Sequence, residues 1–255
     1  MTPLILDVPC LHRIHSGIPK GVHKIHTSIG MSIELDDLLS RLEQLNSVAE
    51  KQNLDKKSVF VTFDDGWIDS LLLREKLRNF QYLQPVLFLT LNQLKGYKKM
   101  LPLPRLYAWC KKQSIDINQI ESIGLSRMEM KCIPEHRQHE ILDRKGIPNF
   151  DSSLETIQPD MIPELLNDGW KIGSHSHDHC DLRIQNSDDL FNGLKEALEL
   201  TVKIGGMPWL AWPEGRWNME MHKIAEKVGF EIQFGLLDEP HETPPDGMIM
   251  RKIWS

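Results

Sequence analysis

Hydrophobic positions along the chain fall alternately into short continuous runs and into stripes with helical spacing. Residues 58–63 and 84–91 are runs rich in β-branched, aromatic and leucine side chains, which is typical of buried strands. Between residues 33 and 50, leucines recur at three- and four-residue intervals, which predicts a helix with one apolar face. A strand–helix rhythm of this kind predicts an α/β fold built on a parallel sheet. The rhythm continues through segments 3–8, 68–80, 161–176, 190–201, 207–213, 218–230 and 231–237.

The stretch from Gly96 to Asn149 interrupts this rhythm. It contains short helix-like pieces at 103–112 and 134–146 and no clear strand. We therefore expect a mainly helical insertion, at about residues 96–149, lying over one face of the sheet. A chain of 255 residues, 40% of them hydrophobic, has the size of one large α/β-barrel domain. Residues 1–255 are expected to form that single domain.

Composition excludes several classes of protein. The net charge is −6 without a basic stripe, so nucleic acid and anionic membrane surfaces are not expected partners. The longest uncharged apolar stretch, residues 82–94, is too short and too polar to span a bilayer. The first ten residues lack the basic and apolar regions of a secretion signal, and the cysteines form no C-x-x-C pair, so we expect a cytoplasmic protein without disulfides. The four cysteines are Cys10, Cys110, Cys132 and Cys180.

Two adjacent aspartates, Asp64 and Asp65, follow the predicted strand at 58–63. Successive strand side chains point to opposite sides, so the two carboxylates are expected to have different partners rather than to share one proton. In parallel α/β folds, the C-terminal ends of the strands form the edge where active sites are built. A helix N-cap is the alternative interpretation, because acidic residues after a strand commonly cap the next helix.

Three histidines alternate at the end of another predicted strand. His175, His177 and His179 stand next to Asp178 and Asp181. Neutral imidazole and carboxylate are the ligands that zinc prefers after thiolate, so this segment is a candidate site for a divalent metal. The four-residue spacing of His175 and His179 places both on one side of a tight turn or a helix end. An accidental histidine-rich loop is the alternative.

Taken together, the two stretches resemble the motifs of the polysaccharide deacetylase family, the NodB-homology domain of carbohydrate esterase family 4. The first motif of that family, T-F-D-D-G, stands at residues 62–66, and the second, H-[S/T]-x-x-H, stands at 175–179. Residues 210–218, LAWPEGRWN, resemble the FAYPYGRYN form of its third motif. The resemblance covers about residues 54–95 and 159–253 and leaves out the predicted insertion.

The resemblance implies a distorted (β/α) barrel, usually seven-stranded, and metal-assisted hydrolysis of an amide. Carried over by position, Asp65, His175 and His179 would hold the metal, and Asp64 would be the general base. Three protein ligands leave room for water and for the carbonyl oxygen of the substrate, while a second carboxylate takes the proton of the water. Zinc is the expected divalent metal, and cobalt and nickel are compatible with the same ligands.

Two positions depart from the pattern of the family. Ala211 stands where many members carry an arginine that orients the base, and Arg251 is our candidate for that role. The last motif of the family supplies a histidine as general acid, and no segment of this chain matches it. His12, which resembles a histidine near the start of the family domain, and His241 are the two candidates.

Several aromatic, acidic and sulfur-containing residues flank the motifs. Trp67 and Trp217 are predicted to contact the substrate, because aromatic faces stack on sugar rings. Glu214 is predicted to face a substrate amine or hydroxyl, with a solvated acid of a loop as the alternative, and His177 is predicted to line the pocket. Cys180 is expected to be a buried cysteine. The remaining histidines of the predicted insertion and of the N-terminal loop are expected at the surface: His23, His26, His136 and His139.

These features predict an N-deacetylase for an amino sugar. A chain in the cytosol would meet nucleotide-linked or lipid-linked N-acetylated sugars, so surface-polysaccharide biosynthesis of the O-antigen type is the expected setting. Two alternatives stay open. One is a deformylase on a lipid-linked amino sugar, and the other is a carbohydrate-binding relative without catalytic activity.

Overall fold

The computed structural model describes residues 7–18, 26–27, 29–97, 100–149, 155–239 and 242–255. Its strands are β1 (Val8–Leu11), β2 (Arg13–His15), β3 (Ser32–Glu34), β4 (Val59–Phe63), β5 (Leu83–Leu89), β6 (Lys171–Ser174), β7 (Trp209–Ala211), β8 (Ile232–Leu236) and β9 (Met248–Ile253). Its α-helices are α2 (Leu35–Lys51), α3 (Arg74–Asn79), α4 (Leu91–Leu94), α5 (Pro102–Gln113), α6 (Arg127–Lys131), α7 (Glu135–Arg144), α8 (Ile162–Asn167), α9 (Ser187–Lys203) and α10 (Met219–Val228). The 3-10 helices are η1 (Ile68–Leu73), η2 (Ile117–Ile123), η3 (Pro159–Met161), η4 (Leu182–Ile184) and η5 (Pro213–Gly215).

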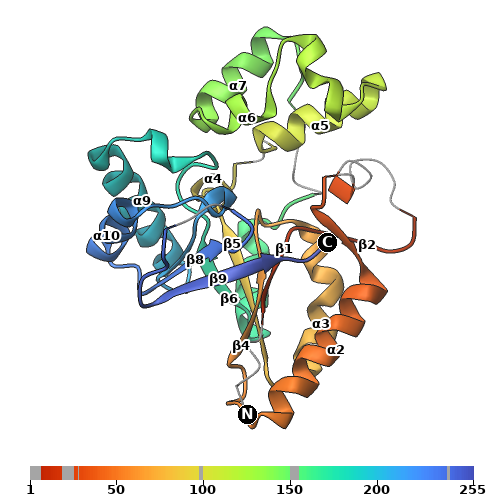
Figure 1. Cartoon of the computed structure of the whole chain (residues 1–255), viewed down its shortest axis with the longest axis vertical. Coiled ribbons are helices and arrows are strands. Elements are labelled where there is room, and N and C mark those ends of the chain that lie inside the picture. Colours follow the sequence, from red (N-terminus) through yellow and green to blue (C-terminus); the bar gives the residue numbers. More distant parts are fainter. Residues whose placement is uncertain (1–6, 19–25, 28, 98–99, 150–154, 240–241) are drawn as a thin grey trace.

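Seven parallel strands form a closed barrel in the order β1-β4-β5-β6-β7-β8-β9, and β9 returns to β1 (Figure 1). The predicted seven-stranded (β/α) barrel is therefore confirmed. The ring is uneven, because β6 and β7 pair only at Ser174 and Leu210, whereas β4 and β5 pair along the whole of β4. Strands β2 and β3 form a separate two-stranded sheet.

Two strands differ from the sequence prediction. A first strand was expected at residues 3–8, whereas β1 begins at Val8, and residues 1–6 lie outside the described residues. Strand β9 was not predicted, because Arg251 and Lys252 break its apolar pattern. Arg251 is nevertheless fully buried, since it pairs with an aspartate inside the barrel. The segment pairs with β8 on one side and with β1 on the other, and it thereby closes the barrel.

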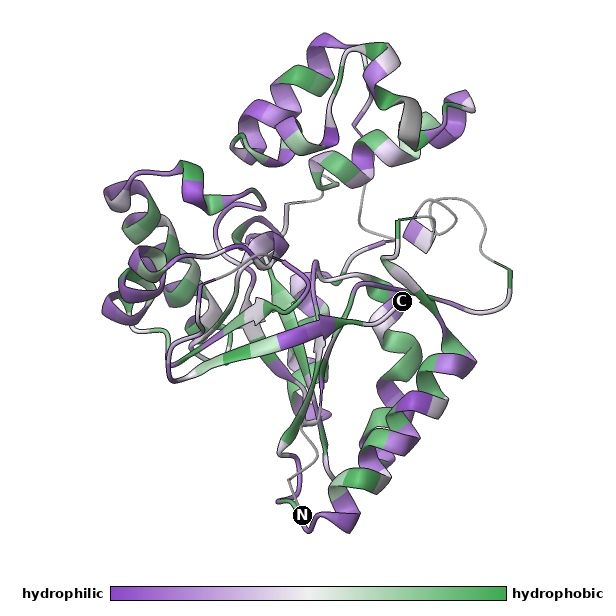
Figure 2. Ribbon diagram, viewed as in Figure 1, coloured by the Kyte–Doolittle hydropathy of each residue, from purple (hydrophilic) through white to green (hydrophobic). Residues whose placement is uncertain are grey.

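The helices around the barrel bury one apolar face each. Helix α2 buries Leu38, Leu42, Leu45 and Ala49, which recur at the predicted helical spacing. In Figure 2 the helices carry both hydrophobic and hydrophilic residues, as expected for elements that pack on one side and meet solvent on the other. No helix in the described parts of the chain combines the length and the hydropathy that a membrane span requires.

Aromatic side chains fill the interior of the barrel. The ring centroids of Phe60 and Trp209 lie 5.2 Å apart, and those of Phe88 and Phe234 lie 5.0 Å apart. The guanidinium of Arg251 lies 5.5 Å from the centroid of Phe88 and 5.8 Å from that of Phe234. These rings make the interior of the barrel apolar, and charge interactions are stronger in such surroundings than they are in water.

The helices of the predicted insertion, α5, α6 and α7, lie together above one end of the barrel (Figure 1). They follow β5 in the chain, so they extend from the C-terminal edge of the strands. Hydrogen bonds tie them to the loop after β6: the Glu135 N–H donates to both carboxylate oxygens of Asp178, at 2.9 and 3.2 Å, and the Asp181 N–H donates to the Lys131 carbonyl at 2.8 Å. The three helices share a hydrophobic cluster of their own, which includes Leu106, Tyr107, Cys110, Met130 and Leu142.

Candidate active site

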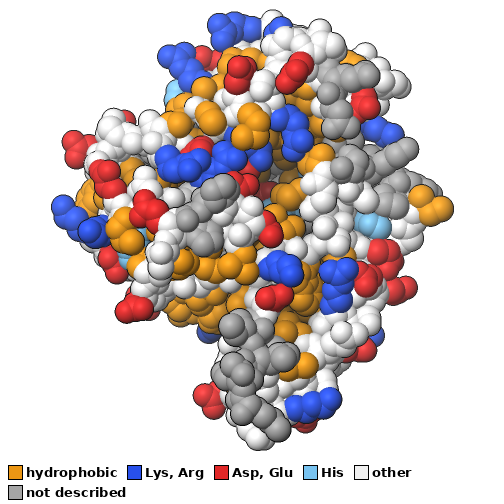
Figure 3. Space-filling view, viewed as in Figure 1, with side chains coloured by type: hydrophobic (Ala, Val, Ile, Leu, Met, Phe, Trp, Pro, Cys, Tyr) orange, Lys and Arg blue, Asp and Glu red, His pale blue; other side chains and the backbone are white. Residues whose placement is uncertain are grey.

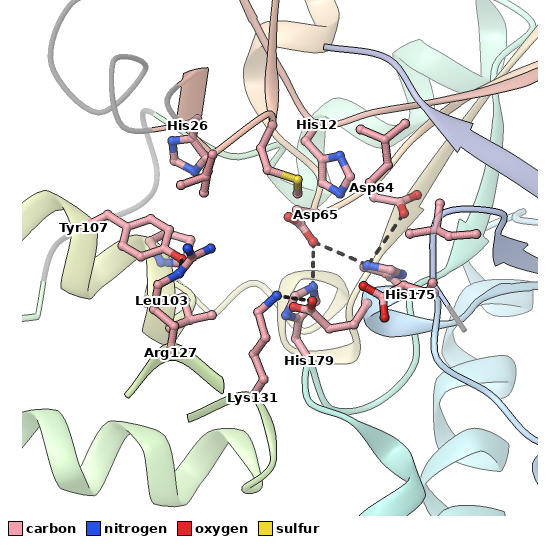
Figure 4. Close-up of a pocket in the computed structure, with 18 residues that line it drawn as sticks. His12, His26, Asp64, Asp65, Leu103, Tyr107, Arg127, Lys131, His175 and His179 are labelled. Atoms are coloured by element: carbon pink, nitrogen blue, oxygen red, sulfur yellow. Dashed lines mark hydrogen bonds and ion pairs between the residues drawn. The ribbon is translucent and has the colours of Figure 1, made fainter. Parts of the chain in front are cut away.

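The polar residues of the motifs meet at the C-terminal edge of the barrel. Asp64 and Asp65 follow β4, His175 follows β6, and Glu214 lies just after β7. All four line one pocket (Figure 4). Because the strands are parallel, their C-terminal ends share one edge, and residues far apart in the sequence converge there.

The backbone at each of these three strand ends passes through a left-handed residue that is not glycine. The φ angles are 62° at Asp65, 68° at Ser176 and 57° at Glu214. Such conformations cost roughly 1–3 kcal/mol each and persist only where the surroundings hold them. At Asp65 the side-chain amide of Gln93 donates a hydrogen bond to the backbone carbonyl. The strained backbone thus fixes where the carboxylate points.

Asp65, His175 and His179 form a compact cluster. His175 donates its Nδ1–H to the carbonyl oxygen of Ala211 at 2.9 Å, so in the neutral ring Nε2 carries the lone pair. That Nε2 lies 3.4 Å from Asp65 Oδ1, and Nε2 of His179 lies 2.8 Å from the same oxygen. The three potential ligand atoms all lie within 4.8 Å of one another. The structure therefore brings these residues together, and their role as metal ligands stays a prediction.

The electrostatics of this cluster favour a cation. Asp65 Oδ1 is buried and accepts no well-directed hydrogen bond, although both imidazoles approach it. Burial raises the pKa of Asp65, but the charge of His179 and the close approach of both imidazoles outweigh it and hold the pKa well below its usual range. Burial lowers the pKa of His179, yet Asp65 raises it to about 9. A proton on His179 therefore competes with a metal for the same lone pair.

The donor set of this cluster fits a catalytic metal site. Two imidazole nitrogens and one carboxylate oxygen are the ligands of a zinc site that keeps open positions. Cys10, His12 and Asp64 form a second group of potential ligands within 4.8 Å of one another. Arg251 already bonds both oxygens of Asp64, and burial raises the pKa of the Cys10 thiol well above its usual range. The second group is therefore unsuited to a cation.

Arg251 holds Asp64 in a fixed orientation. Its Nη1 donates to Oδ1 at 2.6 Å and its Nη2 to Oδ2 at 2.9 Å, and the thiol of Cys10 donates to Oδ2 at 3.3 Å. Burial raises the pKa of Asp64, but the charge of Arg251 outweighs it and lowers the pKa to about 2. Arg251 thus contacts Asp64 directly and reaches it from β9, not from the position of Ala211, and its role in orienting a base stays a prediction.

His12 follows β1 on the same edge. It lines the pocket together with the two aspartates (Figure 4). Only 9% of it is exposed, and its Nδ1 is buried without a hydrogen-bond partner among the described residues. Burial lowers the pKa of His12, so its imidazole is neutral at pH 7. His241, the other candidate for the general acid, lies outside the described residues.

The helical insertion supplies another wall of the pocket. Tyr107 of α5 and Arg127 and Lys131 of α6 line it (Figure 4). The ammonium of Lys131 pairs with the carboxylate of Glu214. None of these three residues was predicted from the sequence. The motifs do not extend into the insertion, and no local pattern distinguishes a cation that faces a pocket from one that faces solvent.

Residues 135–232 match the family model described as polysaccharide deacetylase. The match includes His175, His179 and Ala211 and stops short of Arg251. It supports the resemblance of the second and third motifs, whereas the first motif, at residues 62–66, lies outside the matched segment.

Solved deacetylase structures share the fold. The deacetylase PplD of Streptococcus pyogenes, in complex with acetate, is 14% identical with a TM-score of 0.56, covering 99% of this chain and 93% of that chain. A de-N-acetylase from Aggregatibacter actinomycetemcomitans is 12% identical with a TM-score of 0.56, covering 96% and 93%. The deacetylase domain of BpsB from Bordetella bronchiseptica is 15% identical with a TM-score of 0.54, covering 97% and 96%. No curated protein matches the chain.

Within this deacetylase fold, three predicted substrate contacts are not placed to meet a substrate. Trp67 is 2% exposed, and its indole N–H donates to Asp65 Oδ2 at 3.3 Å. It therefore helps to hold the Asp65 carboxylate in place and has no exposed face for a sugar ring. Trp217 is 2% exposed and packs in the apolar cluster beside α9 and α10. His177 hydrogen-bonds Gln185 at 3.0 Å and lies away from the pocket lining. Of the four predicted contacts, only Glu214 lines the pocket.

The histidines expected at the surface differ in their burial, and Cys180 lies in the core. The prediction for His26 was wrong: it is 4% exposed and lines the pocket, with its ring centroid 5.8 Å from that of Tyr107. His136 is exposed as predicted, His139 is half-buried, and His23 lies outside the described residues. Cys180 is fully buried in an apolar cluster, and burial raises the pKa of its thiol far above the usual value.

Proposed function

We propose that this protein is a metal-dependent hydrolase that removes an N-acetyl group from an amino sugar. The observation that carries the proposal is the convergence in one pocket of Asp65, His175 and His179 with an adjacent carboxylate, Asp64, which Arg251 fixes. The family model described as polysaccharide deacetylase supports the same reaction. As its setting we propose surface-polysaccharide biosynthesis, with a nucleotide- or lipid-linked sugar as substrate.

Asp65, His175 and His179 would hold one divalent metal, most simply zinc. When bound, the metal would polarise the amide carbonyl and make a water more acidic. Asp64 would accept the proton of that water. Hydrogen bonds from Arg251 and Cys10 take three of the roughly four lone-pair positions of its carboxylate, which leaves one position, on Oδ1, for a proton.

His12 is the residue we propose as general acid. Hydrolysis of an amide requires a proton on the leaving nitrogen, because an amine anion is too basic to depart. His12 lines the pocket beside Asp64 and has a free, buried Nδ1 in the described structure. Its imidazole is neutral at rest, so it would receive the proton that Asp64 takes from the water and pass that proton to the amine.

The variant His12→Gln is expected to lower kcat for an N-acetylated sugar about 100-fold and to leave bound metal unchanged. A leaving group that departs without a proton does not need the acid, so hydrolysis of 4-nitrophenyl acetate should fall far less. Steady-state kinetics with the two substrates and metal analysis of the variant measure these effects. An equal loss on both substrates would exclude the role of general acid.

Measurement of acetate release tests the proposed deacetylase function directly. Purified protein loaded with zinc, cobalt or nickel is incubated with N-acetylated sugar nucleotides, lipid-linked sugars and simple glycosides, and acetate and formate are measured. Acetate is the expected product. Formate from an N-formyl substrate would instead identify a deformylase, and tight binding without release of either acid would identify a carbohydrate-binding protein.

A further inference from the structure

Two cations of the helical insertion line the pocket. Arg127 and Lys131 stand four residues apart on α6, a spacing that places them on the same side of a helix. Figure 4 shows both reaching toward the pocket from a side other than that of Asp64 and His12. In Figure 3, Lys and Arg side chains gather where the helical layer meets the barrel, around a hollow. The family model begins at residue 135, so both residues lie outside the matched segment.

Arg127 has donors to spare. Its Nε donates to the hydroxyl of Tyr107 at 2.9 Å, and its guanidinium lies 5.6 Å from the centroid of the same ring. In the described part of the chain, no carboxylate pairs with its two terminal nitrogens. Lys131 pairs with Glu214, and an ammonium group carries three donors, so it too can bond a further acceptor.

The acidic residues of the pocket already have cations of their own. Asp64 pairs with Arg251, and Glu239 pairs with Arg216 at 3.2 Å. Arg127 is therefore the pocket cation whose charge the described residues leave uncompensated. A half-buried guanidinium with free donors, held in place by an aromatic hydroxyl, is preorganised for an anion from outside the protein.

We infer that Arg127 and Lys131 bind the phosphate that joins the N-acetylated sugar to its carrier. This inference rests on the proposed function, since it names the substrate class of the same pocket. The planar fork of an arginine matches two phosphate oxygens at once, and a neighbouring lysine adds a point charge. Two cations suit a phosphate or diphosphate, which presents several charged oxygens, better than they suit a neutral glycoside.

The test compares two sugars that differ only in the phosphate, N-acetylglucosamine 1-phosphate and methyl N-acetylglucosaminide. Metal-loaded wild-type protein is expected to bind the phosphate sugar at least about tenfold more tightly in calorimetry. Arg127→Gln should remove that preference and leave the affinity for the neutral glycoside unchanged. Arg127→Lys should restore part of it. Arg137→Gln is the matched control, because it removes the same charge from a 63% exposed site on α7.

The outcomes separate this inference from the proposed function. Equal affinity for the two sugars, no measurable binding of the phosphate sugar, or equal effects of Arg127→Gln and Arg137→Gln would overturn the phosphate site even if acetate is released. Loss of the preference in Arg127→Gln alone would support it even if no sugar is hydrolysed. The affinities for diphosphate sugars on a uridine or a farnesyl carrier then show which carrier the protein prefers. A diphosphate that binds only by chelating the metal would bind Arg127→Gln as tightly as wild type, which would count against the phosphate site.

Discussion

Replacing Asp65 or His179 with alanine is expected to abolish both metal binding and acetate release, whereas Asp64→Asn should keep the metal and lose activity. Each alanine variant removes one of three ligand atoms that lie within 4.8 Å of one another. Asp64→Asn leaves those three atoms in place and removes the group proposed to accept the proton, which lowers kcat by about 10²–10⁴-fold.

Metal content by elemental analysis, beside kcat for each variant, measures this prediction. Circular dichroism of each variant excludes global unfolding as the cause of the loss. Retention of stoichiometric metal in both Asp65→Ala and His179→Ala would contradict the ligand assignment. A wild-type protein that takes up no metal after reconstitution would instead favour the carbohydrate-binding alternative.

Replacing Arg251 with methionine is expected to lower the free energy of unfolding by about 3–5 kcal/mol, because it leaves the Asp64 carboxylate buried and unpaired. Asp64 is 3% exposed and Arg251 is not exposed at all, and two direct hydrogen bonds join them. Methionine fills part of the volume between the rings of Phe88 and Phe234. The loss should therefore come mainly from the charge.

The double variant Arg251→Met with Asp64→Asn tests that cause. It removes both charges, so it should be more stable than Arg251→Met alone, as measured by urea denaturation. Arg137→Met is the control at an exposed ion pair, with an expected change within about 0.5 kcal/mol. A double variant no more stable than Arg251→Met would show that packing, and not the buried charge, sets the loss.

Local patterns in the sequence predicted most of the barrel. Strands β4 and β5 and helices α2 and α9 were found from apolar runs and helical stripes, because each buries an apolar face whose period is visible in the chain. Strand β9 was missed because its central residue is an arginine. Its burial depends on a partner 187 residues away, and no local period records such a pairing.

For the two adjacent aspartates, strand alternation was an incomplete reason to expect different partners. Different partners were predicted from strand alternation, and Asp64 does pair with Arg251 while Asp65 faces His179, although His175 Nε2 lies 3.4 Å from Asp65 and 4.0 Å from Asp64. However, β4 ends at Phe63, so neither aspartate is a strand residue. The left-handed turn at Asp65 is part of what separates the carboxylates.

The sequence by itself predicted the barrel and the candidate metal cluster, because T-F-D-D-G and H-S-x-x-H are short local segments that resemble motifs of a known family, and the resemblance implies both. Only the tertiary structure decided which residues surround that cluster. It buried Trp67 and Trp217 in packing, brought His26 into the pocket, and placed Arg127 opposite the strand ends. The physical reason is that exposure and charge pairing depend on contacts between segments far apart in the chain, such as the Trp217 cluster beside α9 and α10 and the wall that the insertion adds to the pocket.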